Sequence, residues 1–207
     1  MLHDPLLQEL ASGIAFALTF LLFVPYIRSI KRGTTVPHVF SWLVWAFGTL
    51  VVFLAQLADG GGIGAWPIGL SAGLTGYVAL LSYRVRARIE IEDADWVLFS
   101  LALLAIPSWL VTSDPLWAVV FLTLADLLGF GPTLRKAHDH PHEEHAGFFA
   151  LGGLRNAFVI LALEHLSWTT ALFPAAVGFS CVIVAAYIYV RRTTVPAKQL
   201  ESNGTDA

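Results

Sequence analysis

Charged residues are scarce in this sequence. Asp, Glu, Lys and Arg make up 13% of its 207 residues, about half the share found in soluble domains. Hydrophobic residues make up 57%, and the mean hydropathy is +0.70, which excludes an ordinary soluble globule and a disordered chain. The formal net charge of −3 excludes a basic surface that binds nucleic acid.

Cysteine and lysine are also rare. The single cysteine, Cys181, cannot form an intrachain disulfide. The lysines are Lys31, Lys136 and Lys198, and none lies inside an apolar run, which excludes a retinal Schiff base within the membrane. No pair of nucleophile and base stands out, so we expect neither an enzyme nor a bound cofactor.

Long apolar runs dominate the chain instead. A membrane-spanning helix needs about 20 mostly apolar residues, and breaks rich in charged or turn residues separate seven runs of about this length: residues 10–28, 38–57, 66–83, 95–112, 115–133, 145–163 and 168–190. The sequence therefore predicts an all-α integral membrane protein with seven transmembrane helices. The first residues lack a basic region and a cleavage site, so we expect no signal peptide.

The cationic residues lie on one side of this predicted topology. Eleven of the 12 Lys and Arg residues lie in or beside the first, third and fifth connections or in the tail, and the other one is Arg155. The positive-inside rule places those connections in the cytoplasm. We therefore expect the amino terminus outside, the carboxyl terminus in the cytoplasm, and the plasma (inner) membrane as the location.

An internal repeat relates the first three apolar runs to the last three. Shifting the sequence by 107 residues places Pro25 on Pro132 and Arg28 on Arg135 without a gap. An offset that spans four helices keeps both copies in one orientation, as in a parallel duplication. We expect a first three-helix repeat, a linker helix, a second three-helix repeat and a disordered tail, at residues 1–93, 94–113, 114–192 and 193–207.

The first copy resembles a known family. It carries a proline motif, a short basic loop and a polar aromatic motif: Pro25-Tyr26-Ile27-Arg28, Lys31-Arg32-Gly33-Thr34-Thr35, and Ser41-Trp42 followed by Trp45 and Gly48. This pattern resembles the PQ-loop repeat of the SWEET and cystinosin-like superfamily, with Tyr26 and Thr133 in place of the glutamine. The resemblance implies two three-helix bundles that face each other across a central axis, with a pocket at mid-membrane.

The repeated prolines are candidate hinges. Pro25 and Pro132 lie near the cytoplasmic ends of their predicted helices. Proline removes a backbone donor and permits bending, which would suit a rocking motion between two states. Membrane helices also tolerate proline without such a role, so both interpretations stay open.

Two opposite charges are expected near the centre of the membrane, Asp126 and Arg155. An arginine at this depth costs about 2.5–3.5 kcal/mol to insert, and a nearby carboxylate would offset that cost. We predict an Asp126–Arg155 ion pair, or a network that includes Asn156. It either fixes helix packing or acts in function, with Asp126 taking up a proton or Arg155 contacting an anionic substrate group.

A polar stripe on the second apolar run indicates a binding pocket. Residues spaced by three or four share one face of a helix, and this face carries Ser41, Trp45, Gly48, Thr49, Val52 and Gln56. Trp45 could stack on a flat substrate or pack between helices. The predicted substrate-binding residues are Trp45, Thr49, Tyr77, Asp126, Arg155 and Asn156.

The segment 138–145 (HDHPHEEH) is rich in histidine and acid. This composition could bind a divalent ion or sense pH, but its spacing matches no zinc motif. We interpret it as a solvated cytoplasmic loop and expect no metal site.

Two functional hypotheses follow. The first is a transporter that moves a small solute by alternating access of two three-helix bundles, and the resemblance implies a sugar, an amino acid or a vitamin-like substrate. The second is a ligand-binding receptor without transport, because the KDEL receptor shares the architecture of this superfamily. The expected partners are the small-molecule substrate and the lipid bilayer, and a homo-oligomer is left open.

Overall fold

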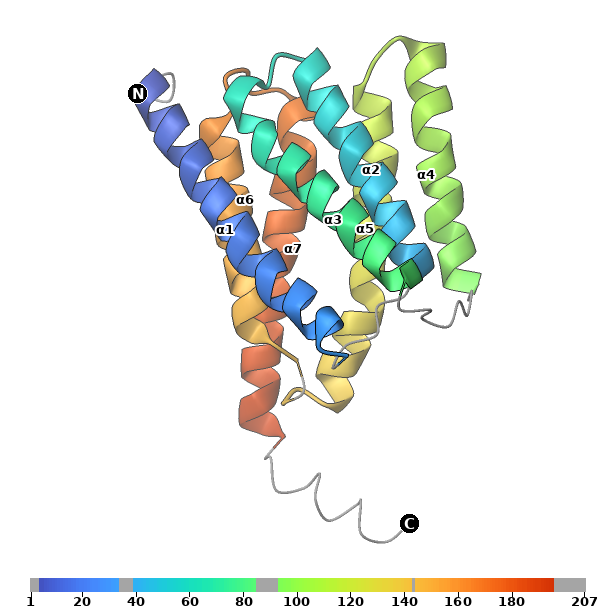
Figure 1. Cartoon of the computed structure of the whole chain (residues 1–207), viewed down its shortest axis with the longest axis vertical. Helices are drawn as coiled ribbons and strands as arrows, with labels where there is room; N and C mark the ends of the chain where they lie inside the picture. Colours follow the sequence, from blue (N-terminus) through green and yellow to red (C-terminus); the bar gives the residue numbers. More distant parts are fainter. Residues whose placement is uncertain (1–3, 34–38, 85–92, 143, 196–207) are drawn as a thin grey trace, which may run out of the picture.

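The computed structural model shows an all-helical protein (Figure 1). It describes residues 4–33, 39–84, 93–142 and 144–195. Within these ranges there is no strand, and the α-helices are α1 (Pro5–Lys31), α2 (Val39–Ala58), α3 (Trp66–Arg84), α4 (Asp93–Thr112), α5 (Leu116–Asp139), α6 (Ala146–Ala162) and α7 (Trp168–Thr194). A short 3-10 helix, η1 (Gly62–Gly64), precedes α3.

The helices have the length and composition of membrane spans. Among the described residues, five segments are long and apolar enough to cross a bilayer: α1, α2, η1 with α3, α5 and α7. Shorter apolar stretches, Trp96–Thr112 and Ala146–Ala162, lie in α4 and α6. Large apolar side chains such as Leu110 and Phe179 face outward, where water would make their exposure unfavourable. The chain is therefore an integral membrane protein.

Local capping explains where two of the helices begin. The carboxylate of Asp4 accepts a hydrogen bond from the backbone N–H of Leu6 at 3.0 Å, and Pro5 occupies the first position of α1, where no donor is needed. Ser167 and Thr170 form a reciprocal capping box at the start of α7. Basic residues in the last turns of both helices favour their carboxyl ends.

The predicted apolar runs agree with the helices except at their ends. α5 continues from the predicted boundary at residue 133 to Asp139, and α7 continues from residue 190 to Thr194. These helices extend beyond their apolar stretches because polar residues also support helical backbone once it has been nucleated. Thr193 and Thr194, assigned to the tail, therefore belong to α7. Residues 196–207 of the predicted tail lie outside the described residues.

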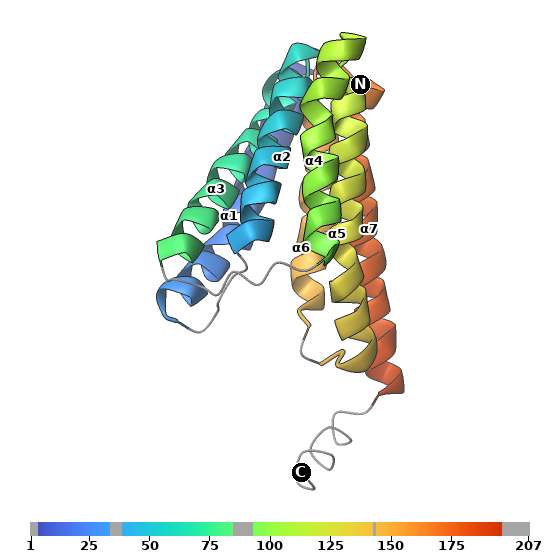
Figure 2. The same cartoon turned by 90° about the vertical axis from the view of Figure 1, so that its right-hand side faces the viewer.

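The two groups of three helices pack in the same order. α3 lies between α1 and α2, and α7 lies between α5 and α6. The groups meet where α1 packs against α6 and where α2 packs against α5. Exchanging α1 with α5, α2 with α6 and α3 with α7 reproduces these neighbours, apart from an additional contact of α2 with α7. α4 packs against α5 and α2, outside the exchange. Figure 2 shows α1–α3 as one layer and α4–α7 as the other.

Hydrogen bonds join the two layers at one end of the molecule. In one part of this end, Glu164 accepts from the backbone N–H of Ile63 at 2.9 Å and donates its own N–H to Gly61 at 3.3 Å. In another part, Asp59 accepts from the hydroxyl of Ser167 and, through its carbonyl, from Nδ1 of His165 at 2.8 Å. We call this end, formed by residues 59–63 and 163–167, the seal.

Two helix side chains extend the seal toward the interior. Nε2 of Gln8 on α1 donates to the carbonyl of Leu163 at 3.0 Å, and Nε2 of Gln56 on α2 donates to the carbonyl of Thr170 at 2.6 Å. Both glutamines are buried. At the opposite end the layers diverge, as Figure 2 shows.

Glycines permit the close approach within the seal. Gly62 has a φ of +59°, and the carboxyl group of Glu164 occupies the space where a Cβ would lie. A Cβ on Gly64 would lie 2.5 Å from the backbone N of Leu163 and 2.5 Å from the carbonyl carbon of Ala162. The backbone of η1 therefore touches the end of α6 directly.

We expect Gly64→Ala to lower the midpoint of thermal unfolding in detergent. The added methyl group would meet backbone atoms that cannot rotate away, and overpacking of this kind costs about 1–3 kcal/mol. Gly73→Ala is the matched control, because a Cβ there finds nothing within 4 Å. Equal midpoints for the two variants, measured by differential scanning fluorimetry, would contradict this close contact.

Candidate substrate-binding cavity

A cavity of about 530 Å³ lies between the two layers. Its lining comes from the second halves of α1 and α5, the first halves of α2 and α6, and the middles of α3 and α7. The lining halves of α1, α2, α5 and α6 point away from the seal, toward the end where the layers diverge (Figure 2). Its volume is within the range of small-molecule sites.

The two copies of the repeat contribute equivalent positions to the lining. Eight residues of the first copy line the cavity together with the residues 107 positions further on: Thr19 with Asp126, Leu22 with Gly129, Phe23 with Phe130, Tyr26 with Thr133, Ser41 with Phe148, Trp42 with Phe149, Trp45 with Gly152, and Thr49 with Asn156. The cavity is therefore centred where the two groups of helices face each other.

Arg155 is held at the deep end of the cavity by three acceptors. Its Nε donates to the hydroxyl of Thr19 at 3.2 Å, Nη1 to the amide oxygen of Asn156 at 3.1 Å, and Nη2 to the carbonyl of Pro67 at 2.8 Å. The Thr19 hydroxyl in turn donates to the carbonyl of Ala15 at 2.7 Å. Arg155 is only 6% exposed. The guanidinium group thus ties α6 to α1 and α3.

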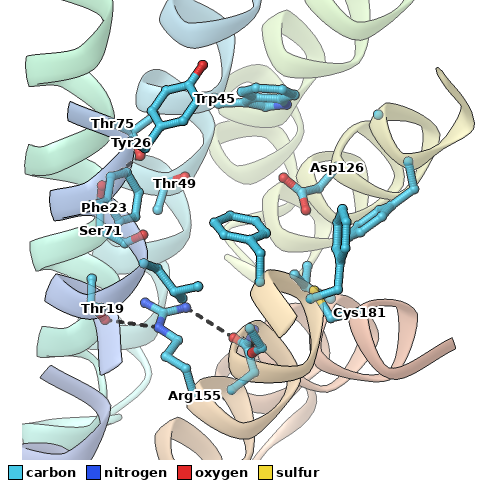
Figure 3. A pocket seen from close by; sticks show the side chains of 18 of the residues that line it. Thr19, Phe23, Tyr26, Trp45, Thr49, Ser71, Thr75, Asp126, Arg155 and Cys181 are labelled. Atoms are coloured by element: carbon cyan, nitrogen blue, oxygen red, sulfur yellow. Dashed lines mark hydrogen bonds between the residues drawn. The ribbon is translucent and has the colours of Figure 1, made fainter. Parts of the chain in front are cut away.

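Asp126 does not form the predicted ion pair with Arg155. The carboxylate has no hydrogen-bond or ion-pair partner within the described part of the chain, and it points into the cavity (Figure 3). The prediction was wrong because α7 lies between α5 and α6, so helices that follow each other in sequence are not neighbours in space. Arg155 does donate to Asn156, but the predicted network of both residues with Asp126 is not formed among the described residues.

Trp45 and Thr49 line the cavity as predicted, whereas Tyr77 lies outside it. The ring of Trp45 packs edge-on against that of Trp42, with centroids 5.4 Å apart. Tyr77 is 37% exposed, and Nζ of Lys31 lies 5.5 Å from its ring centroid. Because Tyr77 follows Thr75 by two residues on α3, it faces away from the cavity side of that helix.

Each of the two candidate hinges directly precedes a residue that lines the cavity. α1 remains helical through Pro25, whose side chain is exposed on the outer face. Tyr26, the next residue, lines the cavity. α5 also remains helical at residue 132, but the side chain of Pro132 lies outside the described residues. The hinge hypothesis stays a prediction.

Several lining residues were not predicted from the sequence. These are hydroxyl, aromatic and thiol side chains: Thr19, Phe23, Tyr26, Ser71, Thr75, Phe130 and Cys181. The repeat itself carried a signal for some of them, since Phe23 recurs as Phe130 and Tyr26 corresponds to Thr133 at the offset of 107 residues. Ser71, Thr75 and Cys181 have no such recurrence.

The histidine-rich segment docks against α7. His138, which is still part of α5, has Nδ1 2.8 Å from the hydroxyl of Tyr187, and Nε2 of His142 donates to the carbonyl of Val195 at 2.7 Å. Arg192 donates to the carbonyl of Pro141 at 3.0 Å. Both imidazoles remain exposed. Within the described ranges, which omit Glu143, no group of three His, Cys, Asp or Glu side chains could hold a metal ion.

Comparison with known proteins gives no match. No protein-family model, no curated protein and no solved structure matches this chain. The chemistry of the cavity is therefore read from its own geometry. It offers aromatic faces, hydroxyl groups, an amide and a carboxylate to a small molecule enclosed between the layers.

We expect Arg155→Met to lower the midpoint of thermal unfolding, because three acceptors on three helices would lose their donor. A hydrogen bond to a charged group contributes about 1.5–3 kcal/mol. Arg155→Lys should not restore the wild-type midpoint, since an ammonium group cannot reproduce the planar geometry of the guanidinium. The control is Arg135→Met at an exposed position of α5. An unchanged midpoint in Arg155→Met would show that these bonds do not hold the layers together.

Proposed function

We propose that the protein is a small-solute membrane transporter that works by alternating access. The observation that carries this proposal is the set of eight repeat-related pairs around one central cavity. A site formed equally by two equivalent halves can be exposed to either side by a rocking motion of one half against the other. The substrate is a small molecule.

The membrane topology is part of this proposal. All seven helices of the described chain would cross the membrane, including α6, whose 17 residues span about 26 Å. Basic residues lie near the ends of α1, α3, α5 and α7, which favours a cytoplasmic position for these ends and an outside position for the seal. The plasma (inner) membrane is the proposed location.

The arrangement of contacts supports a state open to the cytoplasm. The layers are hydrogen-bonded at the seal and diverge at the cationic end (Figure 2). Most hydrogen bonds of the seal are formed by backbone and side-chain groups of two loops, residues 59–63 and 163–167. A neutral bond contributes about 0.5–1.5 kcal/mol, and a bond to the carboxylate of Asp59 or Glu164 about 1.5–3 kcal/mol, because water replaces each bond when it breaks. A seal of this kind can open and close at modest cost in free energy.

A transport assay tests the proposal directly. The purified protein would be reconstituted in liposomes and offered radiolabelled sugars, amino acids and vitamins. We expect time-dependent accumulation of at least one solute. Thr49→Trp should abolish it, because an indole would obstruct the cavity, and Tyr77→Trp should retain it, because Tyr77 lies outside the cavity. Binding without accumulation would instead favour a receptor.

The direction of access can be measured at Cys181. It is the single cysteine of the chain and lines the cavity, so a small membrane-impermeant thiol reagent reports where the cavity opens. We expect labelling in inside-out vesicles and little in right-side-out vesicles. Asp59→Ala should raise labelling from the outside several-fold, because the seal loses the bond to Ser167.

Glu9→Ala is the control for this experiment. Glu9 is an exposed acidic residue near the same end of α1 and lies outside the seal. Its loss should leave the labelling pattern of the wild type unchanged. Equal labelling from both sides in the wild type would contradict a seal that closes the outer end.

A further inference from the structure

We propose, on the basis of the transport function argued above, that the cavity is selective for an organic cation, a flat or alkylated amine whose positive charge lies against Asp126. Three features of the cavity lead to this substrate class: an unpaired carboxylate, an arginine that is already engaged, and aromatic walls.

The first feature is the missing partner of Asp126. At the interface of α1 and α6, Arg155 reaches Thr19. The interface of α2 and α5 is the counterpart of this interface in the repeat. There Gly48 on α2 corresponds to Arg155, and Asp126 on α5 corresponds to Thr19. Gly48 has no side chain that could reach the carboxylate. Its nearest neighbour at the Cβ position is the side chain of Leu122, at 3.1 Å. The position opposite Asp126 is thus left without a donor.

A carboxylate in such an apolar cavity is unfavourable without a compensating charge. Among the described residues that line the cavity, the charged ones are Asp126 and Arg155, and these two are not bonded to each other. A bound cation would supply the hydrogen bond and the countercharge that the described part of the chain does not provide. An anion at the same place would instead be repelled.

The second feature is the state of Arg155. Each of its three nitrogens already donates to an acceptor of the protein, on α1, α3 and α6. These bonds stabilise its charge, hold the guanidinium in place and use three of its five N–H groups, so a substrate carboxylate would meet a charge that the protein has already partly compensated. The carboxylate of Asp126 has no hydrogen-bond or ion-pair partner among the described residues. The cavity therefore offers a stronger site for a cation than for an anion.

The third feature is the aromatic wall next to the carboxylate. The rings of Tyr26 and Trp42 stack with centroids 5.1 Å apart, and Trp42 packs edge-on against Trp45. The indole of Trp45 lies against α5 at Gly129, where a Cβ would be 3.6 Å from it. Gly129 is one helical turn beyond Asp126. Figure 3 shows the Trp45 ring and the Asp126 carboxylate bordering the same space.

Aromatic faces attract cations through their quadrupole, most strongly when the cation is desolvated. Tryptophan provides the best of these faces. A positive group between Trp45 and Asp126 would therefore gain both interactions at once, and its apolar part would contact the remaining rings. Neutral polyols lack the charge that Asp126 can bind, and they have many hydroxyl groups to satisfy among apolar faces.

A matched ligand series tests this inference without a membrane. Tryptamine, tryptophol, tryptophan and indole-3-acetate share one ring and differ in charge, as a cation, a neutral molecule, a zwitterion and an anion. Binding to the full-length protein in detergent would be measured by isothermal titration calorimetry. We expect tryptamine to bind at least about tenfold more tightly than tryptophol, a difference typical of one charged hydrogen bond.

Asp126→Asn should remove this preference, so that tryptamine and tryptophol bind alike. Asp139→Asn, at an exposed position of the same helix, should keep it. Protection of Cys181 gives a second readout that needs no variant: tryptamine should slow its modification by a methanethiosulfonate reagent, and tryptophol should not at the same concentration. This readout remains if Asp126→Asn fails to fold.

The outcomes are distinguishable. Tighter binding of tryptophan or indole-3-acetate, equal binding of all four, or no binding of any would overturn the inference, as would an undiminished preference in Asp126→Asn. Tryptamine binding that depends on Asp126, together with no uptake of tryptamine or any other solute into liposomes, would leave the cation site standing and overturn the transport function.

Discussion

The buried guanidinium of Arg155 sets the geometry at the centre of this protein. A charge in an apolar interior is costly unless hydrogen bonds satisfy it, and here the acceptors of Arg155 come from three helices. Those bonds fix α6 against α1 and against the start of α3. The other interface between the two groups, α2 with α5, has no corresponding bridge because Gly48 stands in the place of the arginine. The carboxylate of Asp126, which has no partner among the described residues, follows from this difference.

The helices were largely predictable from the sequence because length and hydropathy determine a membrane span. Runs near 20 apolar residues allow few other structures, since backbone groups in lipid must be bonded within the segment. The ends were less predictable. α5 and α7 continue past their apolar stretches, and hydropathy carries no information about a helix that leaves the apolar layer. Pro25 was correctly placed within a helix, since a membrane helix tolerates proline.

The site was less predictable, because sequence order does not reveal which helices touch. Asp126 and Arg155 were predicted at similar depths in the membrane. Depth alone does not determine where in the bundle each helix lies or which other helices it contacts. Only the packing order, with α7 between α5 and α6, shows that they belong to different interfaces. The carbonyl of Pro67 is a partner that no sequence pattern marks, since every residue has one. The seal was unpredictable for the same reason. In the sequence, Asp59 and Glu164 are ordinary charged residues of loops, and only the fold shows that each bonds to the opposite layer.

The repeat explains where specificity arises in such a protein. Two identical halves would line the cavity with identical groups and would present the same chemistry twice. Here the equivalent positions have diverged at the deep end, as Thr19 against Asp126 and Gly48 against Arg155. One exchange adds a negative charge and the other a positive charge, but within the described ranges only the positive one has hydrogen-bond partners. The two changes fell on different interfaces, α2 with α5 and α1 with α6, and this leaves the carboxylate available to the cation that we propose. Divergence of the copies, rather than the duplication itself, thus gives the cavity its polarity.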